Sequence, residues 1–300
     1  MAVPLHSLLF TIDIDSLYTN IETGPGLRAV RETFERYPDS SRPDSHILDL
    51  LEICLTSNTF TFNNKQYLQT QGTAMGQRYA PSYANIYMAQ WEREALTKCT
   101  LRPTFFFRFL DDIIGVWEHG IDTFTHFVDT LNNHHTSIKL KHNIDTHKVD
   151  FLDTTVYFHP RGAQNTLRTK VFFKPTDTHA LLHKHSYHPK HTFSGIIKSQ
   201  IIRFTRISST YAQLEEAVNI LFQALGHRGY TKRFLRHVKN TTLAALFPAG
   251  RPPPNTDITY EPSPRLSVAH LPPQTPMDNT NNHTPPSPQH TQTNTHIIPL

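Results

Sequence analysis

The sequence feature that most constrains the fold is a pair of adjacent carboxylates, Asp111-Asp112, between two apolar runs. These runs are rich in aromatic and β-branched residues: Phe105, Phe107 and Phe109 before the pair, and Ile113, Ile114, Val116 and Trp117 after it. Both runs predict strands, so the two carboxylates are expected at the tip of a β-hairpin. There they can face solvent or a cation, whereas two buried neighbouring carboxylates would repel each other. An ordinary Asp-containing turn is the alternative interpretation of the pair taken alone.

A third carboxylate, Asp13, interrupts the short apolar run Leu8–Ile14, and Asp15 follows it. A charge inside such a strand is costly unless a cation or hydrogen-bond donors compensate it. Carboxylates that hold two magnesium ions about 4 Å apart can catalyse phosphoryl transfer, because magnesium prefers hard oxygen ligands and leaves positions for substrate phosphates. Asp13 and Asp111 can supply such ligands if the fold brings them together. They are 98 positions apart in the sequence (111 − 13), and spacing alone does not establish that they meet.

The segment between these carboxylates predicts helices and one further hairpin. Apolar residues at helical spacing predict two core stripes: Leu27, Val30, Phe34 and Tyr37, then Ile47, Leu50, Leu51 and Cys54. Residues 59–68 predict a hairpin with an Asn63-Asn64 turn. The glycine-flanked loop Gln71–Gly76 leads into a helix that opens at Ala80-Pro81 and is expected to bury Ala84, Met88, Trp91 and Ala95. Such a loop can let the backbone approach a ligand closely, or it can be a simple turn.

After the carboxylate pair, a helix with one apolar face is expected at residues 124–131, and strands are expected at 149–158 and 167–173. This order of strands, helices and hairpins predicts an α+β domain with an antiparallel sheet. The 300 residues suffice for one large domain or two modest ones.

From Arg168, at the start of the last predicted strand, the chain becomes rich in basic residues. Residues 168–206 contain eight Lys or Arg against one acid, Asp177, and helical patterns follow at 211–225 and 230–247. In a chain with a formal net charge of only +4, such basic segments favour a surface that contacts a phosphate backbone, although a solvated basic face is the alternative. The histidines between 179 and 191 suit phosphate contact or simple exposure better than zinc, because no Cys or matching carboxylate accompanies them.

The remaining features concern the tail and the compartment. Residues 248–300 hold 13 of the 22 prolines and lack apolar periodicity, which predicts a disordered tail. Cys54 and Cys99 are the only cysteines, so no disulfide framework or Cys-based zinc site is expected. The N-terminus lacks the features of a signal peptide and no apolar run is long enough to span a membrane. The sequence therefore predicts a soluble intracellular protein.

Several motifs together resemble a known family. Asp13–Tyr18, Gln71–Met88 and Phe109–Asp112 are similar, in this order, to the A, B and C motifs of a reverse transcriptase palm. The longer matches resemble the Penelope-like retroelement polymerases: Ser16–Ile21, Gly72–Gly76 with Ala80-Pro81 and Tyr83–Asn85, Phe151–Asp153, and Lys174–Asp177 with His188-Pro189. The resemblance covers about residues 8–247.

The resemblance implies a reverse transcriptase palm over residues 1–178, a basic, helix-turn-helix-like thumb over 179–247, and the tail over 248–300. It also implies specific site residues. Asp13 and Asp111 would hold two Mg²⁺ ions, with Mn²⁺ as an alternative, the Ile14 carbonyl as an auxiliary ligand and Asp112 in support. Tyr18 would exclude a ribose 2′-hydroxyl, unless it is an ordinary core aromatic, and Gln71 and Gly72 would lie against the nucleotide. The residues expected to contact nucleic acid are Lys174, Lys190, Lys198, Arg203 and Arg206.

The implied activity is RNA-directed DNA polymerase, with an RNA template, a DNA primer and deoxynucleoside triphosphates as partners, in the nucleus.

The sequence departs from the family in that Phe109 replaces the usual Tyr and the motif D lysine is ambiguous among Lys139, Lys141 and Lys148. The fingers motifs and the C-terminal GIY-YIG nuclease of many relatives are expected to be missing. The alternative function is therefore a catalytically inactive nucleic-acid-binding remnant. A metal-dependent nuclease has less support, because no separate general base is apparent, and the sequence leaves the oligomeric state open.

Overall fold

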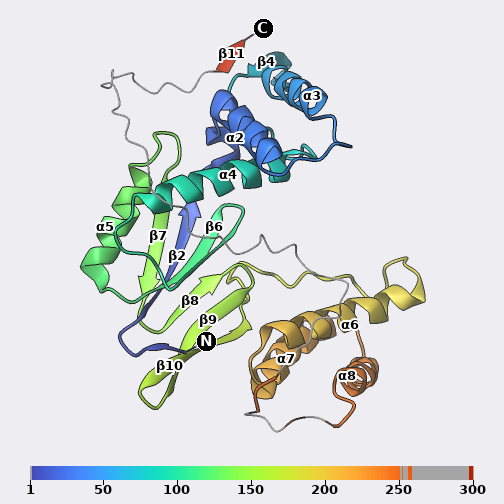
Figure 1. Cartoon of the computed structure of the whole chain (residues 1–300). Coiled ribbons are helices and arrows are strands. Elements are labelled where there is room, and N and C mark those ends of the chain that lie inside the picture. Colours follow the sequence, from blue (N-terminus) through green and yellow to red (C-terminus); the bar gives the residue numbers. More distant parts are fainter. Residues whose placement is uncertain (1, 251, 253–255, 259–296, 300) are drawn as a thin grey trace.

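Figure 1 shows the computed structural model of the chain, which describes residues 2–250, 252, 256–258 and 297–299. Its helices are α1 (Leu17–Asn20), α2 (Thr23–Arg36), α3 (Asp44–Thr56), α4 (Ala80–Thr97), α5 (Ile121–Asn132), α6 (Lys190–Ile207), α7 (Tyr211–His227) and α8 (Lys232–Leu246). Its strands are β1 (Ala2–Pro4), β2 (Leu8–Ile14), β3 (Thr59–Phe62), β4 (Lys65–Gln69), β5 (Phe105–Phe109), β6 (Asp112–Trp117), β7 (Leu140–Asp145), β8 (Lys148–Phe151), β9 (Thr154–Arg161), β10 (Gln164–Val171) and β11 (Ile297–Pro299). The sheets have the orders β5-β6-β2-β7, β1-β10-β9-β8 and β11-β4-β3, and every pairing is antiparallel. The α+β class that the sequence predicts is confirmed.

The central sheet, β5-β6-β2-β7, packs one face against helices α4 and α5 (Figure 1). Ile12 and Ile14 of β2 share a buried cluster with Met88 of α4 and Leu131 of α5. Because successive side chains of a strand point to opposite faces, Asp13 between these two isoleucines points away from the helices, and it is exposed. The helix layer therefore fixes which face of the sheet carries the charge.

Gly115 shows how closely the central sheet is packed. It lies opposite Phe10 in the pairing of β6 with β2, and a Cβ atom there would be 2.3 Å from Phe10 Cζ and 2.6 Å from the Phe105 carbonyl oxygen. The ring of Phe10 uses the space that a side chain at this position would fill. Gly115 is thus required by packing across the strands, not by a turn.

The second sheet, β1-β10-β9-β8, closes over part of the other face of the central sheet. Leu9 of β2 and Val116 of β6 form a buried cluster with Val149 of β8 and Val156 of β9. The sequence predicts a single strand over 149–158, and this is wrong. Leu152, at φ 56°, and Asp153 form a hairpin turn that separates β8 from β9.

The two helices that follow β2 are buried to a smaller extent than their apolar patterns predict. Val30 of α2 is buried, but Tyr37 lies beyond the helix end and is exposed. In α3 the prediction is wrong: Leu50 is 62% exposed and Cys54 is also exposed. The buried residue of this helix is Leu55, with Leu48 and Leu51 partly buried beside it. These three define the face of α3 that packs on the rest of the molecule.

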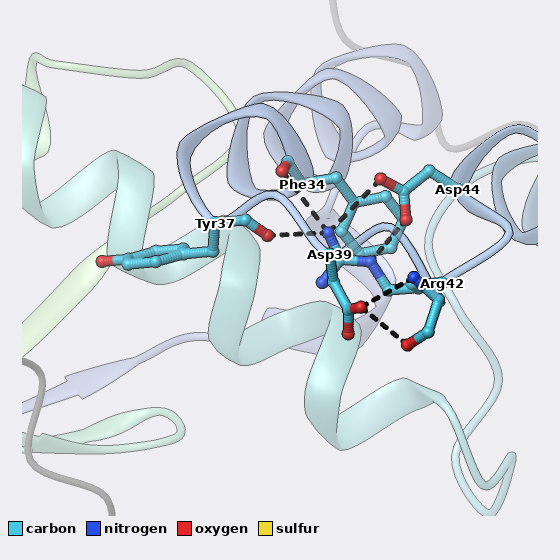
Figure 2. Close-up of polar contacts among 6 residues, drawn as sticks. Phe34, Tyr37, Asp39, Arg42 and Asp44 are labelled. Carbon is cyan, nitrogen blue, oxygen red and sulfur yellow. Dashed lines mark hydrogen bonds and ion pairs between the residues drawn. The ribbon is translucent and has the colours of Figure 1, made fainter.

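The connection between α2 and α3 is organised by Arg42 (Figure 2). Its guanidinium lies over the ring of Phe34 at 4.1 Å and donates hydrogen bonds to the carbonyls of Phe34, at 3.4 Å, and Tyr37, at 2.8 Å. It also pairs with the carboxylate of Asp44, the first residue of α3, and this pairing raises the pKa of Arg42. Asp39 accepts hydrogen bonds from the backbone and side chain of Ser41 in the same turn. One cation therefore satisfies carbonyls at the end of α2 and holds the start of α3.

Helices α6, α7 and α8 form a separate bundle with its own core (Figure 1). Predicted helices at 211–225 and 230–247 correspond to α7 and α8 and are confirmed. Thr210 and Gln213 form a capping box at the start of α7, and the Thr231 side chain caps α8. The capped start of α7 is the predicted one, and α8 begins two residues after its predicted start.

The bundle is joined to the second sheet by polar contacts. The Arg203 guanidinium of α6 pairs with Asp153 in the turn before β9, with Nε and Nη2 at 2.8 and 2.6 Å from the carboxylate. The Thr169 and Ser209 backbones and side chains also bond to each other, with the Thr169 amide donating to Ser209 Oγ at 2.8 Å. Gln213 donates to the Tyr157 hydroxyl. Contacts from three elements therefore fix the bundle against β9 and β10.

The predicted disordered tail falls largely outside the described residues, since 251, 253–255, 259–296 and 300 are not described. Within the described part, Asp257 pairs with Arg168 at 2.8 Å and Ile258 donates its backbone N–H to Ser209. No helix in the described part of the chain has the length and apolar character needed to cross a bilayer.

Candidate active site on the central sheet

The hairpin that carries Asp111 and Asp112 forms as predicted. Strands β5 and β6 are joined by Leu110 and Asp111, with Leu110 at φ 55°. Asp112 begins β6 and pairs with Phe109 across the hairpin. The adjacent carboxylates therefore stand at its tip, beside the last residues of β2.

Strand register brings the distant carboxylates together. Asp13 lies directly opposite Asp112 in the pairing of β2 with β6, and opposite Lys141 in the pairing of β2 with β7. The backbone N–H of Ile14 donates to the Asp111 carbonyl at 3.0 Å. One row across the sheet thus contains an aromatic residue, two carboxylates and a lysine: Phe109, Asp112, Asp13 and Lys141.

The charges of this row act on one another. Burial raises the pKa of Asp112, and the carboxylates of Asp111 and Asp13 raise it further, while Lys174 opposes them. The negative charges of Asp111 and Asp13 thus oppose ionisation of Asp112, and a cation bound beside these carboxylates would relieve that repulsion. The lysine that opposes them, Lys174, comes from the segment after β10, which therefore passes near the row.

The structure separates the three candidate lysines of motif D. Lys141 lies beside Asp13, and its Nζ is 2.9 Å from the Asp15 carboxylate. This contact lowers the pKa of Asp15 and raises the pKa of Lys141. Lys139 instead donates to the Asn132 carbonyl at 3.3 Å, and Lys148 lies on β8. Only Lys141 among these three is part of the carboxylate row.

The glycine loop meets the segment after β2. The Thr73 N–H donates to the Tyr18 carbonyl at 2.7 Å, and Gly72, at φ 78°, approaches the same backbone. A Cβ atom on Gly72 would lie 2.5 Å from the Tyr18 carbonyl oxygen and 2.6 Å from Thr19 Cα. Tyr18 itself is half-buried against the main core, whereas Gln71 is exposed. The loop and Tyr18 therefore form one unit next to β2, and the helix α4 that follows starts at Ala80 as predicted.

The predicted nucleic-acid contacts fall into two groups. Lys174, Lys190, Lys198 and Arg206 are exposed, three of them on α6. Arg203 is also exposed, but its guanidinium is paired with Asp153 and fixes the bundle to the second sheet. Its contact with Asp153 gives this arginine a structural role that its sequence position does not indicate.

Two features of the site were missed by sequence reasoning. Phe107 and Phe109, 65% and 58% exposed, present aromatic surface on the same face of β5, next to the carboxylate row. The alternation of phenylalanines indicated a strand, but not that part of this face stays uncovered. The Lys141–Asp15 pair was likewise missed, because it depends on the register of β7.

The donor set fits a hard divalent cation shared with a substrate. Among the residues that the structure describes, no three His, Cys, Asp or Glu side chains are grouped to hold a metal ion on their own. Magnesium sites in enzymes that act on phosphates commonly use one or two carboxylates and complete their ligands with water and substrate phosphate. Asp13 and Asp111, with Asp112 beside them, can supply this incomplete set.

The fold of the chain is similar to that of known structures. The structure is similar to that of telomerase from Candida albicans in complex with the TWJ fragment of telomeric RNA, with a TM-score of 0.58, 11% sequence identity, and coverage of 79% of this chain and 43% of that chain. It is also similar to apo telomerase from Candida tropicalis, with a TM-score of 0.50, 10% identity, and coverage of 82% and 44%. The chain has a reverse-transcriptase-like fold. It spans less than half the length of these two proteins.

A family model described as the animal helix-turn-helix domain matches residues 180–240, which include α6, α7 and most of α8. The helix-turn-helix character expected of the basic segment is therefore confirmed. No curated protein sequence matches the chain. The helix-turn-helix match covers most of the bundle of α6, α7 and α8. The carboxylate row lies on the central sheet, outside the matched residues.

Proposed function

We propose that the chain is the palm and thumb of a Penelope-like reverse transcriptase, which adds deoxynucleotides to the 3′-hydroxyl of a DNA primer on an RNA template. The observation that carries this proposal is the row of Asp112 and Asp13, with Asp111 at the hairpin tip, in a reverse-transcriptase-like fold. The ordered motifs around these residues support the assignment to the Penelope-like polymerases. We assign residues 1–178 to the palm and 179–247 to the thumb.

In this proposal the carboxylates and their neighbours have distinct roles. Asp13 and Asp111 hold the metal ions, with the Ile14 carbonyl as an auxiliary ligand, and Asp112 supports them. Bound Mg²⁺, or Mn²⁺, would lower the pKa of the attacking hydroxyl and stabilise the leaving pyrophosphate. Lys141, beside Asp13, is the best-placed proton donor for that pyrophosphate, because the other candidate lysines lie outside the row.

The groups around the row bind the substrates. Tyr18 and the Gly72 loop, which are hydrogen-bonded to each other, form the wall for the sugar of the incoming nucleotide, with Gln71 exposed beside it. The exposed rings of Phe107 and Phe109 offer an apolar surface to the primer end. Lys174, an exposed lysine whose charge acts on Asp112, would contact the primer backbone.

Primer extension tests the proposal. The chain is expected to extend a DNA primer on an RNA template in the presence of Mg²⁺, and EDTA or Asp111→Ala is expected to abolish extension. The reason is that Asp111 supplies an oxygen ligand that Ala lacks. Extension that Asp111→Ala leaves unaffected would sink the assignment of the carboxylates.

The second candidate function is a non-catalytic nucleic-acid-binding protein. The helix-turn-helix match and the exposed basic residues of α6 favour it independently of the carboxylates. Salt-sensitive binding with no extension under any metal condition would support this function over the polymerase.

Binding through α6 has a measurable salt signature. Lys190→Ala and Lys198→Ala are each expected to reduce the slope of log K against log salt concentration by about 1, because each removes one phosphate contact. The matched control is Lys239→Met on α8, because the ammonium of Lys239 already pairs with Glu215. Fluorescence anisotropy of a labelled duplex over a salt series measures these slopes. Slopes that are unchanged in both α6 variants would contradict a role for this helix in backbone contact.

A further inference from the structure

Arg108 of β5 lies three residues before Asp111, on the face of the central sheet that helix α4 covers. Successive side chains of a strand point to opposite faces, so Arg108 points toward α4, whereas the exposed rings of Phe107 and Phe109 lie on the face of the carboxylate row. Only 10% of the Arg108 side chain is exposed. A guanidinium that is covered to this extent requires partners for its charge and for its N–H donors.

The partners of Arg108 come from α4 and from the hairpin itself. Its Nε donates to the Glu92 carboxylate at 3.1 Å, and its Nη1 donates to Asn85 Oδ1 at 3.0 Å. Nη1 also donates to the Leu110 carbonyl at 3.1 Å. The guanidinium is planar and rigid, so its donors keep fixed positions relative to one another. One side chain therefore ties helix α4 to the tip of the β5–β6 hairpin.

Leu110 has a backbone conformation that requires such support. Its φ of 55° lies in the left-handed region, which is unfavourable for a residue with a Cβ atom. Such conformations persist where the surrounding contacts fix them. The hydrogen bond from Arg108 to the Leu110 carbonyl is a contact of this kind. It therefore helps to fix the turn in the conformation that places Asp111.

Asp111 is held on both sides of its Cα atom. The Leu110 carbonyl belongs to the peptide group that precedes Asp111, and Arg108 donates to it. The Asp111 carbonyl belongs to the peptide group that follows, and the backbone N–H of Ile14 donates to it at 3.0 Å. Each peptide group is planar, so fixing both of them sets the direction in which the Asp111 side chain leaves the backbone. Arg108 supplies the half of this support that comes from the helix layer.

We propose that Arg108 is a positioning residue for the metal site, and that it sets the direction of the Asp111 carboxylate through the Leu110 carbonyl. This inference rests on the proposed function, in which Asp111 holds a metal ion. Arg108 points away from the carboxylate row, so it acts on the site only through the hairpin. Helix α4, which follows the loop of Gly72, thereby holds the metal-binding hairpin in a fixed position relative to that loop.

Steady-state primer extension over a series of Mg²⁺ concentrations tests the proposal with Arg108→Gln. The kcat is expected to fall about a hundredfold, because a misplacement of about 1 Å costs that much, and the Mg²⁺ concentration for half-maximal extension is expected to rise about tenfold. The KM for deoxynucleotide is expected to stay close to that of the wild type, because Arg108 contacts no substrate. The matched control is Arg102→Gln, an exposed arginine in the loop before β5, which is expected to behave as the wild type does. Equal kcat and equal Mg²⁺ dependence in the two Gln variants would overturn the proposal.

Hydrogen exchange of the hairpin separates this proposal from that of the polymerase, because it requires neither turnover nor metal. The amides of residues 109–112 are expected to exchange about tenfold faster in Arg108→Gln than in the wild type or in Arg102→Gln, since a hydrogen bond from a charged donor is lost. Unchanged exchange would overturn the role of Arg108. A wild type that does not extend primers, with faster exchange in Arg108→Gln, would contradict the polymerase and still support the positioning of Asp111 by Arg108.

Arg108→Lys separates positioning from stability. Lysine keeps the positive charge that pairs with Glu92, but it lacks the planar fork that also reaches Asn85 and Leu110. This variant is expected to unfold close to the denaturant concentration of the wild type, and yet to show the lowered kcat and the faster hairpin exchange. It also decides the question if Arg108→Gln does not fold. Wild-type kcat and wild-type exchange in Arg108→Lys would mean that the charge alone is sufficient, which would overturn the proposal.

Discussion

Asp13→Asn is expected to lower the rate of primer extension by about a thousandfold or more, since loss of a charged metal ligand removes several kcal/mol of transition-state stabilisation. The change keeps the size and the strand position of the side chain but removes the negative charge that faces Asp112. The side chain is exposed, on the face away from the helix core, so the fold is expected to survive. Single-turnover extension under saturating nucleotide measures the effect.

Asp15→Asn is the matched control for this change. Asp15 lies two residues further along, but its carboxylate is paired with Lys141 at 2.9 Å. Its replacement is expected to change the extension rate by about tenfold at most, because it weakens a neighbouring ion pair and removes no metal ligand. Equal losses in both variants would mean that the local charge, and not a ligand at Asp13, controls activity.

Gly72→Ala is expected to destabilise the chain by about 3–5 kcal/mol and to abolish extension with it. The added Cβ would lie 2.5 Å from the Tyr18 carbonyl oxygen and 2.6 Å from Thr19 Cα, and both contacts are with backbone, which cannot move aside as a side chain can. The positive φ of 78° adds a conformational cost for any residue other than glycine. Chemical denaturation measures the free energy of unfolding.

Gly76 in the same loop provides the control. Its φ of 94° is also positive, but a Cβ atom there meets nothing within 4 Å. Gly76→Ala is therefore expected to cost only the conformational part, about 1–2 kcal/mol. If the two variants unfold at the same denaturant concentration, the close approach of the loop to Tyr18 does not contribute to stability.

The local elements of the site could be predicted from the sequence. Alternating phenylalanines before Asp111 and apolar residues after it require a hairpin, and the asparagines at 63 and 64 do the same for β3 and β4. Both depend on neighbours a few residues apart, so periodicity and turn chemistry are sufficient. The helix α4 was predicted for the same reason, with its proline near the first turn and its stripe of buried residues.

The register between distant strands could not be predicted. Nothing within β2 or β6 alone specifies that Asp13 lies opposite Asp112 and not opposite Ile114, because a slip of two residues keeps the same face. The space that Gly115 leaves for Phe10 helps to fix this register, but the pairing is recognisable only in the folded sheet. The motif resemblance supplied the expectation that Asp13 and Asp111 meet, which spacing did not.

Predictions that depended on tertiary contacts were less successful. The apolar pattern of α3 is compatible with more than one buried face, and packing selects Leu48, Leu51 and Leu55 while leaving Leu50 exposed. The turn at Leu152 interrupts a run whose composition is that of a continuous strand. Arg203 was grouped with the other basic residues because its partner, Asp153, is 50 positions away.

The central claim is that Asp13 and Asp111, supported by Asp112, hold a divalent metal beside the ends of β2 and β6, the two inner strands of the central sheet. Electron paramagnetic resonance of Mn²⁺, titrated into the chain with a deoxynucleoside triphosphate, tests it without requiring turnover. The wild type is expected to reduce the free Mn²⁺ signal beyond what nucleotide alone does, and the double change of Asp13 and Asp111 to Asn is expected to remove this excess, whereas Asp39→Asn in the α2–α3 turn leaves it intact. Equal Mn²⁺ binding by the wild type and the double variant would contradict the claim.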